Sequence, residues 1–345
     1  MWYTLAVLRQ HEVTQSLPMN IIITGSIAYD YLMRFPGRFV EHLLPDQLHQ
    51  VSLSFLVDDM TKHWGGVAAN IAFTAGLLGL RPRLMGTVGR DFGDYRAWLE
   101  NVGVDTSTVR QIDDVFTASF FVNTDLDNNQ IASFYTGAMA YARHFSLADV
   151  CKDAPDLVVI SPNDPQAMMN LTEECRQNGI RFLYDPSQQV PRLSGEDLAR
   201  SMQKAYAMVI NAYEAEIICH KTGQTIDALR RDIEILVITQ GANGSHIYAG
   251  GERHEIPAFP CDGIKDPTGA GDAFRGGFLR GLASGWPLPL AGQLGALCAT
   301  YALEHVGTQN HYFTIPEFVE RFRAFFDDAG LLDSLLEPAS TRAEH

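Results

Sequence analysis

The sequence predicts a doubly wound α/β fold, with a mainly parallel sheet and helices on both of its faces. Apolar runs of strand length recur along the chain, many end in a small or polar residue, and helical segments separate the later runs. Runs this continuous are typical of strands buried on both faces, as parallel strands are. The alternation of strand and helix predicts right-handed βαβ units. The strands are expected at residues 21–23, 157–160, 182–184, 208–210 and 235–238.

Capping signals place helices between these runs. Asp164 and Pro165 form an N-cap followed by a proline at the first helical position, and Gly179 is positioned to end that helix. Ser194 is followed three residues later by Asp197, which is the pattern of a capping box. Both helices therefore have a defined start in the sequence.

Two regions interrupt the pattern and are rich in strand signals. Residues 34–64 contain no convincing helix and alternate in polarity over 50–57. In the second insertion, residues 113–139, positions 115–136 alternate in two halves around turn residues 125–129. We expect the two insertions to form a small β-sheet lid over the strand ends, with surface decoration as the alternative. The other segments are assigned to an α/β core (19–33, 65–112 and 140–330), a poorly ordered N-terminal extension (1–18) and a C-terminal tail (331–345).

Composition argues against nucleic acids and membranes as partners. The 345-residue chain has a formal net charge of −15 at pH 7, which disfavours contact with anionic surfaces. No apolar run reaches the length of a membrane span. The five cysteines form no C-x-x-C pair. This usage indicates a reducing cytoplasm and disfavours a disulfide framework or a zinc site.

The most informative motif runs from Asp266 to Phe274 and joins a glycine-rich turn to a helix. Backbone N–H groups at a helix N-terminus attract phosphate, and Gly269 and Gly271 let the backbone approach a ligand closely. Asp272 stands at the junction, where it can take the proton of an attacking hydroxyl. The motif therefore predicts phosphoryl transfer. The alternative is an ordinary loop with a helix cap, because short glycine patterns have low specificity.

A second motif, at residues 65–76, opens with two glycines and continues as a helix with almost no charged face. Such a helix is expected to be buried. Asn70 then needs hydrogen-bond partners, which substrate hydroxyls would supply. Asp30 is a further candidate for binding hydroxyls, although an isolated Asp after a strand is more often a turn former. Ligands of open α/β sheets bind at the carboxyl ends of the strands. The polar residues expected there are Ser26, Asp185, Asn211 and Thr239.

Four motifs follow one another along the chain in a defined order. They are Gly65-Gly66 with Asn70, Asn211-x-x-Glu214, Thr239-Gln240-Gly241-x-x-Gly244, and residues 266–272. In order and spacing they resemble the motifs of the ribokinase family, the phosphofructokinase-B group, over about residues 19–325. Within that family the chain is similar to bacterial adenosine kinases of the mycobacterial type. The stretches that carry this similarity are 24–30, 32–39, 51–59, 131–135 and 185–189.

The resemblance implies a ribokinase-like kinase that uses ATP and Mg²⁺ to phosphorylate the 5′-hydroxyl of adenosine, giving AMP in purine salvage. It assigns Asp272 as the catalytic base and the backbone of Gly269, Ala270 and Gly271 as the anion hole. It assigns Glu214 to Mg²⁺, through water. The implied nucleoside-binding residues are Ser26, Asp30, Gly66, Asn70, Gln188 and Gln189, with Phe120 and Phe134 flanking the base. The implied ATP-binding residues are Asn211, Thr239, Gly241 and Gly244.

The resemblance also implies a homodimer that pairs through the lid sheets, in which Ser54 reaches the site of the neighbouring subunit. Several family members use K⁺ near the glycine-rich loop, but Pro267 stands where many relatives carry a small polar residue, which leaves K⁺ open. One alternative is a kinase of ribose, fructose, guanosine or inosine. The other is a non-catalytic nucleotide-binding protein on the same fold. The intact Asp272 favours an enzyme, and the two phenylalanines favour a nucleoside over a bare sugar.

Overall fold

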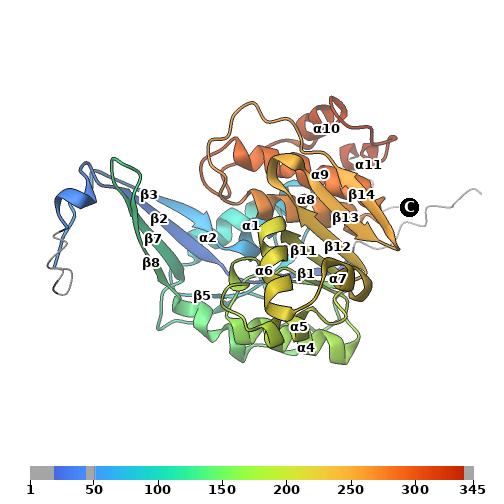
Figure 1. Ribbon diagram of the computed structural model, residues 1–345, viewed down its shortest axis with the longest axis horizontal. Helices are drawn as coiled ribbons and strands as arrows, with labels where there is room; N and C mark the ends of the chain where they lie inside the picture. Colours follow the sequence, from blue (N-terminus) through green and yellow to red (C-terminus); the bar gives the residue numbers. More distant parts are fainter. Residues whose placement is uncertain (1–18, 44–49, 51, 338–345) are drawn as a thin grey trace, which may run out of the picture.

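A mainly parallel sheet forms the centre of the molecule (Figure 1). The computed structural model describes residues 19–43, 50 and 52–337, and in this part of the chain the sheet has eight strands in the order β14-β13-β12-β11-β10-β9-β1-β4. The strands from β4 to β12 are parallel, and β13 and β14 continue the sheet antiparallel. Their bounds are β1 Ile21–Thr24, β4 Arg83–Met85, β9 Leu157–Ile160, β10 Phe182–Tyr184, β11 Ala207–Asn211, β12 Ile235–Thr239, β13 Ser245–Ala249 and β14 Glu252–Ile256.

Side chains along the parallel strands alternate between two buried faces. In β11, Val209 packs on one face, whereas Met208 and Ile210 pack on the other. Helices α1 (Val67–Leu77), α2 (Gly93–Asn101), α8 (Ala270–Ala283) and α9 (Leu288–Leu303) cover the first face. Helices α4 (Pro165–Asn178), α5 (Gly195–Met202), α6 (Ala212–Thr222) and α7 (Ile226–Asp232) cover the second face. The predicted doubly wound α/β fold is therefore confirmed.

The predicted helix starts are confirmed, although Ser194 and Asp197 form a simple N-cap and not the reciprocal capping box. The Asp164 side chain accepts from the N–H of Ala167 at the start of α4, and Gly179 ends that helix in the left-handed conformation. The Ser194 hydroxyl accepts from the N–H of Asp197 at the start of α5. None of the helices in the described part of the chain is both long and apolar enough to cross a membrane.

A small second sheet projects from one side of the molecule (Figure 1). Within the described residues it has four strands in the order β3-β2-β7-β8. Its strands are β2 Ala28–Arg34, β3 Asp59–Gly65, β7 Ala118–Thr124 and β8 Gln130–Tyr135. The two insertions thus form one sheet, as predicted, although the sheet begins at Ala28 rather than at residue 34. Two parallel strands, β5 (Thr87–Val88) and β6 (Arg110–Gln111), lie outside both sheets.

The strand signal at residues 50–57 was misleading. Residues 52–57 form a loop, and the strand that pairs with β2 is β3, which starts at Asp59. The Phe55 ring packs edge-on against the rings of Phe35 and Phe39, each at a centroid distance of 4.9 Å. The alternating apolar residues thus reflect packing of a loop rather than a ladder of strand hydrogen bonds.

The C-terminal boundary also differs from the prediction. Leu332 and Leu335 are buried in a cluster with α9 and α10 (Ile315–Arg323), and the short helix α11 (Asp333–Leu336) follows. Residues 331–336 therefore belong to the folded core and not to a tail, because their apolar side chains complete that cluster. The predicted N-terminal extension, residues 1–18, lies outside the described residues.

The strand order reverses between β1 and β9. After β1 the chain continues to β4 on one side, and it later enters β9 on the other side. The N–H of Ser26 donates to the carbonyl oxygen of Pro162 at 2.8 Å, which joins the segments that follow the two strands. In open α/β sheets such a reversal creates a crevice at the carboxyl ends of the strands.

Candidate active site

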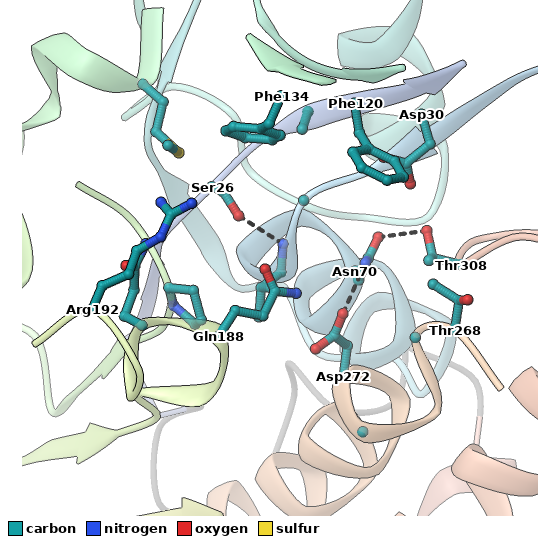
Figure 2. Close-up of a pocket in the computed structure, with 18 residues that line it drawn as sticks. Ser26, Asp30, Asn70, Phe120, Phe134, Gln188, Arg192, Thr268, Asp272 and Thr308 are labelled. Atoms are coloured by element: carbon teal, nitrogen blue, oxygen red, sulfur yellow. Dashed lines mark hydrogen bonds between the residues drawn. The ribbon is translucent and has the colours of Figure 1, made fainter. Parts of the chain in front are cut away.

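A cavity of about 400 Å³ lies at this reversal, between the strand ends and the small sheet (Figure 2). This volume is within the usual range for a site that binds a small molecule. Phe120 and Phe134 lie on one side of the cavity, and Asp272 lies on the opposite side. The predicted site residues that line it are Ser26, Asp30, Gly66, Asn70, Phe120, Phe134, Gln188, Gln189, Gly269, Gly271 and Asp272.

The glycine-rich turn leads directly into α8 at the floor of the cavity. Gly269 adopts a left-handed conformation with φ of 82°, and a Cβ atom there would lie 2.9 Å from the Cβ of Thr308. No side chain caps the start of α8. Backbone N–H groups in the first turn of a helix lack partners within the helix, so they can bind an anion. The N–H of Ala270 makes one long hydrogen bond, of 3.4 Å, to the carbonyl oxygen of Pro267. This turn has the backbone conformation that the predicted anion cradle requires.

Asp272 occupies the first turn of α8 and faces the cavity. Burial raises the pKa of its carboxyl group to about 7, and the opposing effects of Arg275 and of a hydrogen bond from Asn70 only partly offset burial. The Asn70 amide donates to Asp272 Oδ2 at 2.8 Å. A carboxylate with a pKa near 7 is well suited to accept a proton at neutral pH.

Asn70 has protein partners on both sides of its amide group. Its Oδ1 accepts from Thr308 Oγ1 at 3.0 Å and from Gln309 Nε2 at 2.8 Å, while its Nδ2 donates to Asp272 (Figure 2). These acceptor contacts fix the orientation of the amide, so its NH₂ group faces the carboxylate. The sequence predicted that Asn70 needs partners, but the protein itself supplies them. No signal in the sequence links Asn70 to residues 238 positions away.

Gly66 precedes α1 and brings the backbone close to the strand end at Ser26. Its φ is 92°, and a Cβ atom there would lie 2.6 Å from the carbonyl oxygen of Ser26. The Ser26 hydroxyl accepts from the N–H of Val67 at 3.0 Å. Only glycine fits this approach at position 66.

Asp30 lies in the middle of β2, directly beside Phe120 of β7. Burial raises the pKa of its carboxyl group to about 6, and the negative charge of Asp266 adds to this effect. The side chain lines the cavity between the aromatic pair and the glycine-rich turn. In its ionised form it offers acceptor oxygens to ligand hydroxyl groups.

The far end of the cavity combines aromatic and amide groups. Phe120 and Phe134 are directly opposite each other on β7 and β8, so their side chains share one face of the small sheet. Gln189 Nε2 donates to the carbonyl oxygen of Asn163 at 2.8 Å, and its Oε1 is buried without a partner in the described residues. Arg192 also lines this end and was not predicted, although it follows Gln188 and Gln189 on the same turn.

The residues assigned to ATP do not line this cavity but gather at the neighbouring strand ends. Asn211 and Thr239 end β11 and β12 and lie beside each other in register. Asn211 and Glu214 form a capping box at the start of α6, and burial raises the pKa of Glu214. Gly241 and Gly244 both have positive φ, in the turn after β12. Ala270 and Ser54 are likewise not among the residues that line the cavity, and Ser54 is exposed in the loop before β3.

Comparisons with known proteins agree with this geometry. The family model described as pfkB family carbohydrate kinase matches residues 24–314. The chain belongs to this family. A nucleoside kinase of Methanothermobacter thermautotrophicus is 33% identical over 311 residues, covering 88% of this chain and 96% of the relative. The structure of Burkholderia thailandensis nucleoside kinase in complex with inosine has a TM-score of 0.78 and 38% identity, covering 89% of this chain and 98% of the other.

A second structure of the Burkholderia enzyme, in complex with ADP-inosine, has a TM-score of 0.76 and 40% identity, and it covers 89% of this chain. The predicted ribokinase-like fold and pfkB family membership are therefore confirmed. The chain is a kinase of the nucleoside and sugar class within an ATP-dependent family. The phosphate acceptor and the role of each side chain are inferred from the chemistry of the cavity.

Proposed function

We propose that this kinase transfers the γ-phosphoryl group of ATP to the 5′-hydroxyl of adenosine, giving AMP in purine salvage. The supporting observation is that one cavity has a carboxylate and a glycine-rich helix start at one end and two phenylalanines at the other. A nucleoside has the matching arrangement, with a primary alcohol at one end and a planar base at the other. A bare sugar would leave the aromatic end unused.

In this proposal Asp272 is the base that takes the proton from the 5′-hydroxyl. The N–H groups of Gly269, Ala270, Gly271 and Asp272 stabilise the negative charge on the transferred phosphoryl group. Asp30, Gly66 and the second Nδ2 hydrogen of Asn70, which bonds to none of the described residues, hold the ribose hydroxyls, and Ser26 borders the sugar. The base stacks on Phe120 and Phe134. Gln188 and Gln189 line the base end, and an amide oxygen can accept a hydrogen bond from an amino group such as that of adenine.

ATP is proposed to bind along the neighbouring strand ends, next to Asn211, Thr239, Gly241 and Gly244. Among the described residues, no group of three or more acidic, His or Cys side chains could hold a metal by itself. This arrangement fits Mg²⁺, which keeps several waters and binds mainly to substrate phosphates. Only the Oε2 atom of Glu214 is used in the capping box, so its Oε1 atom would hold such a water. The bound ion would neutralise the phosphate charge.

A second candidate substrate is a nucleoside with an oxygen in place of the amino group, such as inosine. Arg192 lines the base end of the cavity, and its guanidinium only donates hydrogen bonds. The exocyclic carbonyl oxygen of such a base would accept this hydrogen bond, whereas the amino group of adenine would not. The Burkholderia relative crystallised with inosine supports this alternative.

A turnover panel separates these acceptors. We expect ATP-dependent product formation with adenosine to have the highest kcat/KM, inosine and guanosine to follow, and ribose and fructose to react poorly. A higher kcat/KM for inosine would identify Arg192 as the dominant recognition group and contradict the assignment to adenosine. Preference for ribose would contradict the nucleoside assignment altogether.

We also propose a cytoplasmic homodimer that pairs through the small sheets. Large apolar side chains, including Leu53, Leu56 and Met60, are exposed on or beside the small sheet. Such residues are typical of a surface that another protein covers. All five cysteines are free, which fits a reducing compartment. Activation by K⁺ is tested by comparing turnover in KCl and in a tetraalkylammonium chloride at equal ionic strength. Higher turnover in KCl would indicate a K⁺ site.

A further inference from the structure

Arg275 is a buried cation one helical turn beyond Asp272 on α8. Only 7% of its side chain is exposed. Its Nη2 donates to Asp185 Oδ1 at 2.7 Å, to Ser187 Oγ at 2.9 Å and to the carbonyl oxygen of Val209 at 3.2 Å. The Asp185 side chain is completely buried, so the pair is shielded from solvent.

The three acceptors belong to different parts of the site. Asp185 and Ser187 form the turn that carries Gln188 and Gln189 into the cavity, and their side chains bond each other at 2.5 Å. Ser187 has a φ of 34°, which is unusual for a residue other than glycine. Val209 lies in β11, two residues before Asn211. The guanidinium of Arg275 therefore joins helix α8 to the turn beside the proposed nucleobase position. It also joins α8 to strand β11, which leads to the proposed ATP site.

The other terminal nitrogen of Arg275 lies next to the anion cradle. A Cβ atom on Gly271 would lie 2.9 Å from Nη1, so glycine at this position leaves space for the guanidinium. None of the hydrogen bonds that Arg275 makes with the described residues uses Nη1. A fixed positive charge at this place lies close to where negative charge develops in phosphoryl transfer.

Stability alone is a weak reason for this arrangement. Removing a charged pair from water is unfavourable, and well-packed apolar residues in its place often give equal or greater stability. Desolvation opposes the charge of Arg275, but Asp185, Asp272 and Glu214 outweigh it and raise its pKa. The charge is therefore retained where it faces several carboxylates of the site.

We propose that Arg275 is a positioning residue for phosphoryl transfer, which fixes the turn at Asp185–Gln189 against α8 and supplies positive charge beneath the anion cradle. This inference rests on the proposed role of Asp272 as the base. The charged and titratable groups that face Asp272 are Arg275 on its own helix, Asp185 after β10, Asp30 on β2 and the Tyr95 hydroxyl on α2. Arg275 is the group among them that favours the ionised form of Asp272.

The test compares pH profiles of kcat/KM for Arg275→Met, Arg275→Lys and wild type, with Arg280→Met as control on the same helix. Loss of the charge in Arg275→Met should move the acidic limb upward by about one pH unit or more and lower kcat at least about tenfold. Arg275→Lys keeps the charge but not the planar fork, so its limb should stay near wild type while KM for the nucleoside rises. Arg280→Met should leave the limb in place.

Asp185→Asn should shift the acidic limb of the kcat/KM profile in the opposite direction from Arg275→Met. The negative charge of Asp185 raises the pKa of Asp272, so its removal should move the acidic limb to lower pH. This variant also keeps the proposal testable if Arg275→Met fails to fold. Limbs that coincide with wild type in folded Arg275→Met and Asp185→Asn, with changes only in thermal stability, would overturn the proposal. Full turnover in Asp272→Asn would instead overturn the proposed function itself.

Discussion

Two opposing effects set the pKa of the Asp272 carboxyl group. Burial in the cavity raises the pKa of its carboxyl group, while Arg275 and Asn70 act in the opposite direction. With the resulting pKa of about 7, a large fraction of the carboxyl groups is ionised at neutral pH. The ionised group is also basic enough to accept a proton, as its proposed role requires. Arg275 directly follows the motif around Asp272. Asn70, Asp185 and Asp30 lie on other segments, so the pKa cannot be read from the motif alone.

The first prediction concerns the activity of Asp272→Asn. An amide cannot accept the proton of the 5′-hydroxyl, so kcat should fall by about 10² or more while nucleoside binding is retained. Steady-state kinetics give kcat, and calorimetric titration with adenosine gives the affinity. Turnover close to that of wild type would show that Asp272 is not the base. In wild type, kcat/KM should fall about tenfold per pH unit below about pH 7, where Asp272 becomes protonated.

The second prediction concerns stability. The pKa of Asp272 is higher in the folded protein, at about 7, than its ordinary value of 3.8. Its contribution to stability is therefore fully present below about pH 4 and is lost as pH rises through 7. Asp272→Asn removes this loss, so the variant should have a higher Tm than wild type at pH 8 and a smaller advantage at pH 5. Thermal unfolding of both proteins at several pH values measures the difference, and a constant difference would contradict a buried, titrating carboxyl group.

At the scale of elements, the β7–β8 hairpin presents different side chains on its two faces. Phe120 and Phe134 point to the cavity. Phe121 points to the opposite face, where its ring stacks on Tyr31 at a centroid distance of 4.8 Å. This alternation follows directly from the period of two along a strand, and it provides a control within the same hairpin.

The third prediction uses that control. Stacking of a base on an aromatic side chain contributes about 1–3 kcal/mol, so Phe134→Ala should raise KM for adenosine by about tenfold or more, with a smaller change in kcat. Phe121→Ala removes a ring from the other face and should leave KM near that of wild type. Steady-state kinetics of both variants test the assignment. Equal increases in KM would indicate that the substitutions act through the stability of the sheet and not through the base.

The elements also show what local sequence can and cannot predict. The helix starting at Pro165 was predictable because Asp164, Pro165 and Gly179 act on their own neighbours. The loop at 52–57 was not, because its apolar residues pack against Phe35 and Phe39, which lie earlier in the chain. The glycine-rich turn and the start of α8 were predictable for the same local reason. The contacts of Asn70 with Thr308 and Gln309 depend on tertiary packing and have no local signal.

At the scale of the whole molecule, the cavity is lined by residues from two separate sheets, the central sheet region and the small sheet. The core supplies Asp272 and the glycine-rich turn, and the small sheet supplies Asp30 and the two phenylalanines. Both sheets must therefore come together around the ligand for the proposed reaction to exclude water. The strand signals of the two insertions predicted a small sheet, but the sequence analysis assigned Asp30 to the core, whereas it lies on β2 of the small sheet.

The fourth prediction concerns the proposed dimer. Ser54 is exposed and does not line the cavity of its own chain, so it would act on a nucleoside only in a neighbouring subunit. Ser54→Ala should raise KM for adenosine about threefold to tenfold, as expected for one lost hydrogen bond. Mixing this variant with Asp272→Asn subunits should restore a low KM in part of the sites. The reason is that a mixed dimer combines an intact Asp272 on one chain with Ser54 from the other.

The control for this experiment is Ser54→Ala mixed with a subunit that carries both substitutions, which can supply neither group. That mixture should show no recovery. Sedimentation equilibrium of the wild type should show a dimer at the concentrations used in the assay. A monomer, or a Ser54→Ala defect that mixing does not relieve, would mean that each chain binds its nucleoside without help. The exposed apolar side chains at Leu53, Leu56 and Met60 would then need another partner.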